Sequence, residues 1–244
     1  MCAQCTRRAR LPRCARRWRD IDSISLDRVK FDGPGTGKSP LEQEPRFVFP
    51  GVQMDIAMDR QSAKALLEWE PVSSRIARAR FHSKFVKITV IQCYAPTNQA
   101  EEEAKDLFYQ CLQAQLDRTP CHDLLLVIGD LNAKGGSENS GYECMGRERE
   151  GVESENGCLL KDLFRENGLA IGGTLFKHKK VHKMTWTSQD QRTINQIAHV
   201  MINQKWRRSL LDAKAVRGAD VGSGHHLMLA KTLPQAEKSK QEGV

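Results

Sequence analysis

The chain has 244 residues, of which 39% are hydrophobic and 28% are charged, and this composition is typical of a globular protein with a sizeable core. No apolar run approaches the roughly 18 residues that a membrane-spanning helix needs, so a membrane protein is not expected. Eight cysteines scattered over a chain of this length exclude a disulfide scaffold and favour reduced thiols.

The net charge of +8 is concentrated at the N-terminus. Residues 1–20 contain seven arginines and one acid, Asp20, which leaves only +2 for all later residues. Such an arm would attract any polyanion without sequence preference, and it is also typical of disordered sequence. Cys2 and Cys5 have zinc-ligand spacing, but no fourth ligand follows Cys14 at a suitable distance, so no zinc site is predicted.

Residues 1–50 show no sustained hydrophobic period and contain five prolines, which predicts an Arg/Pro-rich, disordered arm. This arm contains the letters GTGKS, at residues 35–39, which resemble the end of a phosphate-binding loop. The loop pattern needs a glycine at position 32, where the chain has Asp32, and prolines follow where a helix should run. We therefore interpret GTGKS as a chance match, while a nucleotide-binding protein stays the least favoured alternative.

Regular elements are expected from Ser74 onward. Residues 75–81 alternate as a strand with one wet face, a short polar turn follows, and residues 85–94 predict a more central strand. Residues 95–120 predict a helix whose start is marked by Asn98 and Glu101 at capping-box spacing. Its apolar face would comprise Ala104, Leu107, Phe108, Cys111 and Leu112.

The next segment, LLLVIGDLNAKGG at residues 124–136, runs from a buried strand into Asp130 and Asn132. Side chains at i and i+2 share a face of a strand, so both would point the same way if the extended geometry persisted. An isolated Asp-x-Asn is also what an ordinary turn favours. The residues alone leave both interpretations open.

A second helix is predicted from Glu155 to Asn167, ending at Gly168. Its buried face would comprise Leu159, Leu160, Leu163 and Phe164. Short strands are expected at 168–173, 183–188, 194–203, 209–216 and 225–231, before a polar, disordered tail at 235–244. Many strands interrupted by a few helices predict an α/β fold in which two mixed sheets pack together under helices.

Five motifs occur in the order and spacing of a known family: IQCYAPTN, VIGDLNAKGG, TWTS, NQIAHVMI and ADVGSGHHLMLAK. The chain thereby resembles the endonuclease domain of non-LTR retrotransposons, within the endonuclease/exonuclease/phosphatase superfamily. The resemblance covers about Gly51 to Lys231 and implies a domain at 51–234 with a four-layer αββα sandwich. It further implies a magnesium or manganese ion and hydrolysis of phosphodiester bonds in DNA. We expect an intracellular protein without a membrane partner, which is nuclear if it is functional.

The resemblance also assigns roles to residues. Asp130 would activate the attacking water and hold the metal, Asn132 would position that water or a phosphate oxygen, and Tyr94 and His225 would contact the scissile phosphate. The residues expected to bind phosphate or DNA around them are Thr185, Arg78 and Arg80. A metal, a base and hydrogen-bond donors are the parts that phosphodiester hydrolysis needs.

The chain departs from the family at three places. Ala198 replaces the aspartate that would orient the histidine, and Gly224 replaces a second carboxylate. The first strands of the family, which carry a metal-binding glutamate, have no match in the arm, although Glu42 and Glu44 lie there. We therefore expect an N-terminally truncated sandwich that binds magnesium weakly and hydrolyses DNA slowly or not at all.

Two further expectations follow from the lost strands. The exposed sheet edges would need cover, which a partner protein could supply. The alternative to a weak enzyme is a catalytically dead remnant that still binds nucleic acid.

Overall fold

The computed structural model describes residues 46–47, 56–57, 60–136, 146, 152–216 and 224–233. Most of the arm, with GTGKS, Glu42 and Glu44, lies outside the described residues, as does the tail.

A six-stranded mixed sheet forms the centre of the fold, in the order β3-β4-β5-β6-β10-β7. Its strands are β3 (Leu66–Pro71), β4 (Ile76–Phe81), β5 (Ile88–Tyr94), β6 (Leu124–Asp130), β7 (Leu169–Ile171) and β10 (Ala198–Asn203). Only β5 and β6 pair in parallel, and the helix α2 (Glu102–Asp117) makes the crossover between them. Because the two strands run in one direction, their carboxyl ends lie at the same edge of the sheet.

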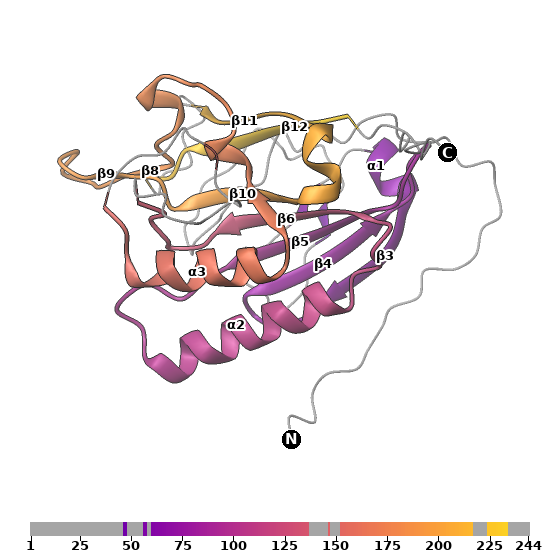
Figure 1. Ribbon diagram of the computed structural model, residues 1–244, viewed down its shortest axis with the longest axis horizontal. Helices are drawn as coiled ribbons and strands as arrows, with labels where there is room; N and C mark the ends of the chain where they lie inside the picture. The colour runs from indigo at the N-terminus through magenta and orange to yellow at the C-terminus, as the bar shows by residue number, and fades with distance from the viewer. Residues whose placement is uncertain are drawn as a thin grey trace, which may run out of the picture.

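Helices α2 and α3 (Glu155–Glu166) cover one face of this sheet (Figure 1). Between helices and sheet lies an apolar cluster that includes Ile91, Val127, Leu112 and Phe164. Burial of these side chains removes them from water, and this burial is the main force that attaches the helices to the sheet.

The start of α2 differs from the prediction. Glu101 occupies the N-cap position without a side-chain cap, and Asn98 instead accepts a hydrogen bond from the backbone of Asn156, so the predicted capping box is wrong. Ala104 and Leu107 are also exposed rather than buried. The face that meets the sheet comprises Lys105, Phe108, Leu112, Gln115 and Leu116.

The prediction for α3 was closer. Ser154 caps the helix by accepting a hydrogen bond from the amide of Gly157, and Gly168 follows it in the left-handed conformation, with φ of +59°. Leu160, Leu163 and Phe164 are buried as expected, whereas Leu159 is 37% exposed.

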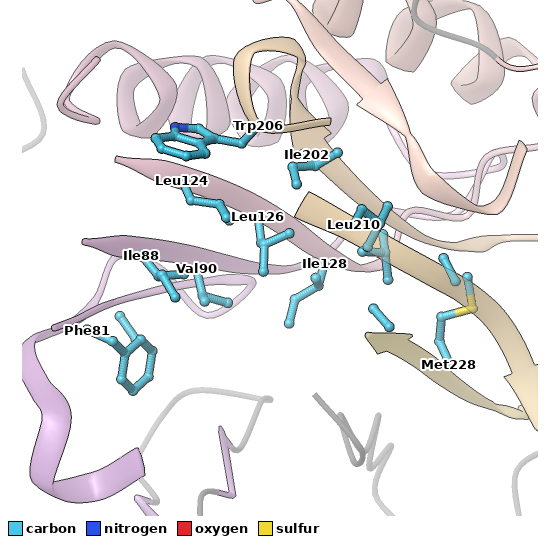
Figure 2. Close-up of a cluster of buried hydrophobic side chains, with 14 of the residues drawn as sticks. Phe81, Ile88, Val90, Leu124, Leu126, Ile128, Ile202, Trp206, Leu210 and Met228 are labelled. Carbon is cyan, nitrogen blue, oxygen red and sulfur yellow. The ribbon is translucent and has the colours of Figure 1, made fainter. Parts of the chain in front are cut away.

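The opposite face of the sheet packs against β11 (Leu210–Val216) and β12 (Leu227–Thr232), which pair with each other. Figure 2 shows side chains of β5, β6 and β10 gathered with Leu210 and Met228 in this second apolar cluster. The α/β sandwich that the sequence predicts is thus confirmed, with helices, a main sheet and a second pair of strands in successive layers.

The remaining elements are short. They are β1 (Arg46–Phe47), β2 (Ile56–Ala57), α1 (Arg60–Ala65), β8 (Trp186–Thr187), β9 (Ile194–Asn195), and the 3-10 turns η1 (Gly172–Thr174), η2 (Lys180–His182) and η3 (Gln204–Ser209). Residues 194–203, expected as one strand, form both β9 and β10. Among the described residues, every helix is too short or too polar to span a bilayer.

The two neighbouring leucines of α3 allow a test of the helix face. Leu160→Ala should lower the free energy of unfolding by about 2–5 kcal/mol, because Leu160 is 1% exposed and its loss leaves a cavity. Leu159→Ala, on the same helix, should cost under about 1 kcal/mol. Urea denaturation of both variants measures the difference, and equal losses would contradict the packing described for α3.

Candidate active site

Three residues form a row across the carboxyl edge of the central sheet. Tyr94 ends β5 and is the register partner of Asp130, which ends β6. Asp130 is also the register partner of Ala198, at the start of β10. All three lie on the face that packs toward β11 and β12, because each continues the alternation of the strand residues in that cluster.

His225 approaches this row from the segment that precedes β12, where it forms an isolated bridge with Trp186 of β8. Its Nδ1 lies 3.8 Å from Oδ2 of Asp130. This separation is too long for a hydrogen bond, and the buried Nδ1 has no hydrogen-bond partner among the described residues. The structure therefore brings Asp130, Tyr94 and His225 to one edge of the fold, although these residues are far apart in sequence.

Burial, rather than mutual attraction, dominates the electrostatics of this pair. Asp130 is 1% exposed, and burial raises its pKa from an ordinary value of 3.8 to about 6, against the lowering effect of the Asn132 amide. Burial also lowers the pKa of His225, with a smaller contribution from neighbouring His226. At pH 7 the histidine is therefore neutral while Asp130 is mostly ionised, so the contact is not an ion pair at that pH.

Asn132 does not continue the strand. The strand ends at Asp130, and Asn132 adopts a left-handed conformation with φ of +46°. Its backbone amide donates to Oδ1 of Asp130 at 3.0 Å, and its side-chain amide donates to the carbonyl of Ala95 at 2.9 Å. The extended geometry that would place both side chains on one strand face is thus absent, and a turn closed by Asp130 holds Asn132 instead.

Thr185 is fully buried, and its hydroxyl accepts hydrogen bonds from the backbone amides of Ile197 and Ala198. The residue therefore fixes the start of β10 beside Asp130. A role in binding phosphate stays a prediction, and these contacts give the hydroxyl a structural use.

Arg78 and Arg80 lie on β4, on the face that α2 and α3 cover. Arg80 donates to both carboxylate oxygens of Asp123, at 2.6 and 3.0 Å, and Arg78 donates to Glu68 at 3.3 Å. Asp123 precedes the first residue of β6, and Asp130 is the last. At the rise of about 3.3 Å per strand residue, Asp123 therefore lies about 20 Å from Asp130. The structure does not bring these two arginines to the edge that carries Asp130.

Arg75 is a cation at this edge that the sequence reasoning missed. Its guanidinium lies over the ring of Tyr94, 5.4 Å from the centroid, and donates to the Tyr94 carbonyl at 3.3 Å. The residue sits in the turn before β4, where no motif marks it. Its position depends on the pairing of β4 with β5 and is therefore visible only in the fold.

The described residues do not fit a magnesium site. No group of three or more His, Cys, Asp or Glu side chains among them is arranged to hold a metal ion. Ala198 has no ligand atom where a second carboxylate would lie beside Asp130. Gly224 has φ of +73°, and a Cβ there would lie 2.4 Å from the Thr187 carbonyl, so a carboxylate at that position would need a rearranged backbone.

Comparisons with known proteins place the chain in context. No protein-family model matches it. Craniofacial development protein 2 from Tragulus javanicus is 34% identical over 225 residues, and the protein of the same name from Bos taurus is 34% identical over 219 residues. Each match covers 87% of this chain but 39% and 36% of the respective relatives, so the chain spans under two-fifths of their length.

Solved structures show the same fold. The endonuclease domain of TRAS1, a telomere-specific non-LTR retrotransposon, matches with a TM-score of 0.53 and 16% identity, over 73% of this chain and 71% of that one. The AP endonuclease LMAP from Leishmania major matches with a TM-score of 0.51 and 12% identity, over 67% of this chain and 56% of that one. At these identities the likeness establishes the architecture.

The raised pKa of Asp130 predicts how stability depends on pH. A carboxyl that binds its proton more tightly in the folded state stabilises the fold fully below pH 4, and this contribution is lost as the pH rises through 6. The change from 3.8 to about 6 corresponds to about 3 kcal/mol. Asp130→Asn should therefore unfold at higher urea concentration than the unmodified protein at pH 7.5, and the difference should vanish near pH 4.

Comparing Asp130→Asn with the unmodified protein separates the effect of Asp130 from that of His225, which both proteins contain. The lowered pKa of His225 acts in the opposite direction, because its contribution to the stability of the fold is present above pH 6.5 and is lost on acidification. Asp106→Asn, at an exposed position of α2, is the control and should follow the unmodified protein at every pH. A stability of Asp130→Asn equal to that of the unmodified protein at pH 7.5 would show that the buried charge carries no cost.

Proposed function

We propose that the chain belongs to the endonuclease/exonuclease/phosphatase superfamily, as a nuclease-type domain that binds DNA at the carboxyl edge of β5 and β6 and hydrolyses it weakly or not at all. The observation that carries this proposal is the 3.8 Å approach of His225 to Asp130, beside positions 198 and 224 that offer no second carboxylate.

The residues at this edge retain part of what phosphodiester hydrolysis needs. Asp130, with a pKa of about 6, is ionised at pH 7 and basic enough to accept a proton from water. His225 is neutral there and can donate one hydrogen bond to a phosphate oxygen through whichever ring nitrogen carries the proton. The Tyr94 hydroxyl could be a further donor.

Charge neutralisation is the part that these residues lack. An ionised Asp130 repels an incoming phosphate, and neutral His225 does not offset that repulsion. Arg75, over the Tyr94 ring, is the described cation best placed to attract the phosphate backbone. Magnesium or manganese could supply the missing charge, and with a single described carboxylate we expect such binding to be weak.

A retroelement origin is part of the proposal, and it is based on the likeness to one solved structure. TRAS1 is a non-LTR retrotransposon whose matching domain is an endonuclease. We therefore propose DNA as the partner, the nucleus as the place of action, and residues 51–234 as the folded domain, flanked by the arm at 1–50 and the tail at 235–244. A second protein that covers the sheet edges is part of the same proposal.

Two alternatives have different tests. A catalytically dead remnant would bind DNA without nicking it under any metal condition, whereas a weak nuclease would nick slowly. A nucleotide-binding protein that used GTGKS, outside the described residues, would bind ATP and lose that binding on Lys38→Ala.

Nicking of supercoiled plasmid tests the enzymatic part of the proposal. We expect the purified protein to nick no faster than background in millimolar magnesium or manganese. His225 lacks the carboxylate that would orient it, and neutralising the corresponding group in a serine-protease triad costs about 10⁴ in kcat.

The matched control is His225→Ala, which removes the imidazole from the site. Nicking by the unmodified protein that this variant loses would establish an active nuclease and overturn the expectation. Nicking that persists in the variant at the same rate would identify a contaminating activity.

Binding of a labelled duplex at several salt concentrations tests the proposed DNA surface. Arg75→Ala should weaken binding to every sequence alike and reduce the slope of log K against log salt by about 1, as expected for one lost phosphate contact. Arg165→Ala, 54% exposed on α3 and ion-paired with Asp162, should leave both quantities unchanged. An equal effect of both variants would point to nonspecific charge attraction instead of the proposed edge.

A further inference from the structure

Two loops carry the candidate site, and the N-terminus of α3 lies against both. The first loop, residues 95–98, follows Tyr94, and the second, residues 131–136, follows Asp130. Neither loop belongs to a strand or a helix in the structure. The Ala95 amide of the first loop donates to the Asp130 carbonyl of β6, and the remaining contacts of both loops include ones from outside the central sheet.

Asn156, in the first turn of α3, contacts both loops. Its side-chain amide donates to the carbonyl of Pro96 at 3.0 Å and to the carbonyl of Asn132 at 3.2 Å. Its backbone amide donates to Oδ1 of Asn98 at 3.1 Å. The residue is 1% exposed, so these bonds form away from water, where an unmade bond is costly.

The orientation of this side chain is fixed by chemistry. The amide nitrogen faces two carbonyl oxygens, and the reversed amide would place its own oxygen against them. Oδ1 of Asn156 has no hydrogen-bond partner among the described residues. The nitrogen is thus the functional atom, which an isosteric aspartate lacks.

Residues next to Asn156 hold the start of α3 against the second loop. Ser154 accepts a hydrogen bond from the amide of Lys134 at 3.0 Å and, at the same oxygen, the capping bond from Gly157. A Cβ on Gly157 would lie 2.0 Å from the Lys134 carbonyl, so the close approach requires glycine there. The helix terminus and the second loop are therefore packed backbone to backbone.

We propose that Asn156 is a positioning residue that holds the loop after Tyr94 and the loop after Asp130 in register with each other. Its relevance to phosphodiester binding rests on the function proposed above. The left-handed Asn132 is the residue most dependent on this contact, because its carbonyl receives the bond from Asn156 while its side chain reaches back to Ala95.

Segment-resolved hydrogen exchange tests the proposal without any need for activity. The amides of Leu131, Asn132 and Lys134 have identified acceptors, namely the Ile197 carbonyl, Asp130 and Ser154. In Asn156→Asp, exchange at 131–134 should accelerate about tenfold or more, because two buried hydrogen bonds are lost. Exchange in β11 and β12, which lie away from the loops, should change only as much as global stability does.

Asn167→Ala is the matched control. Asn167 ends the same helix, and its side chain bonds to Gln113 and to the Leu163 carbonyl without touching either loop. This variant should lose stability without selective acceleration at 131–134. Equal acceleration in both variants would reduce Asn156 to an ordinary helix residue and overturn the proposal.

A milder variant keeps the proposal testable if Asn156→Asp does not fold. Asn98 is exposed, and Asn98→Ala removes only the bond that its side chain accepts from the backbone of Asn156. Exchange in the segment after Tyr94 should accelerate severalfold, and unchanged exchange there would contradict the proposal.

DNA affinity, measured on the same variants, separates the two proposals. Accelerated exchange together with weaker duplex binding supports both. Accelerated exchange in a protein that never binds DNA supports the positioning role and refutes the proposed function. Unaltered exchange in a protein that binds DNA refutes the positioning role and supports the proposed function.

Discussion

The parallel pairing of β5 with β6 is the constraint on which the candidate site depends. It places Tyr94 beside Asp130 at one edge of the sheet and requires a crossover, which α2 provides on the covered face. The antiparallel addition of β10 then sets Ala198 on the other side of Asp130. The two loops that follow β5 and β6 contact α3, because Asn156 in its first turn donates hydrogen bonds to the carbonyls of Pro96 and Asn132. The chemistry at the edge is therefore supported by helix packing on the far side of the sheet.

The same edge carries a buried carboxylate, that of Asp130. Burial raises the pKa of Asp130 to about 6, although the Asn132 amide acts to lower it. Ala198 could accept a carboxylate in a row that already exists, since its side chain shares a face with Asp130. Gly224 could not do so without a change of backbone, because it is left-handed and in close contact with Thr187. Positions 198 and 224 thus differ in whether the present backbone could carry a carboxylate.

The arginines in and before β4 differ in their contacts. Arg78 and Arg80 look available in an alternating strand, but Glu68 and Asp123 engage them at the side of the sheet that the helices cover. Thr89 also donates to Asp123, so this network is part of the packing between β4, β5 and the start of β6. Arg75, a few residues earlier, remains at the edge with Asp130. Location relative to the strand ends, rather than charge or spacing, distinguishes these roles.

The sequence by itself determined the α/β class, the positions of β4, β5, β6 and both long helices, and the convergence of Tyr94 and His225 on Asp130. These features could be predicted because hydrophobic periodicity depends on neighbouring residues, and because the order of motifs can be read from the sequence alone. The sequence did not reveal β3, whose residues LLEWEP follow α1 without a turn and carry acids and a proline. Nor did it reveal that Asn132 leaves the strand, that Leu107 and Leu159 face water, or that Asn156 bonds to both loops. Tertiary structure decided those features, because each depends on which backbone carbonyl or apolar face a distant segment presents.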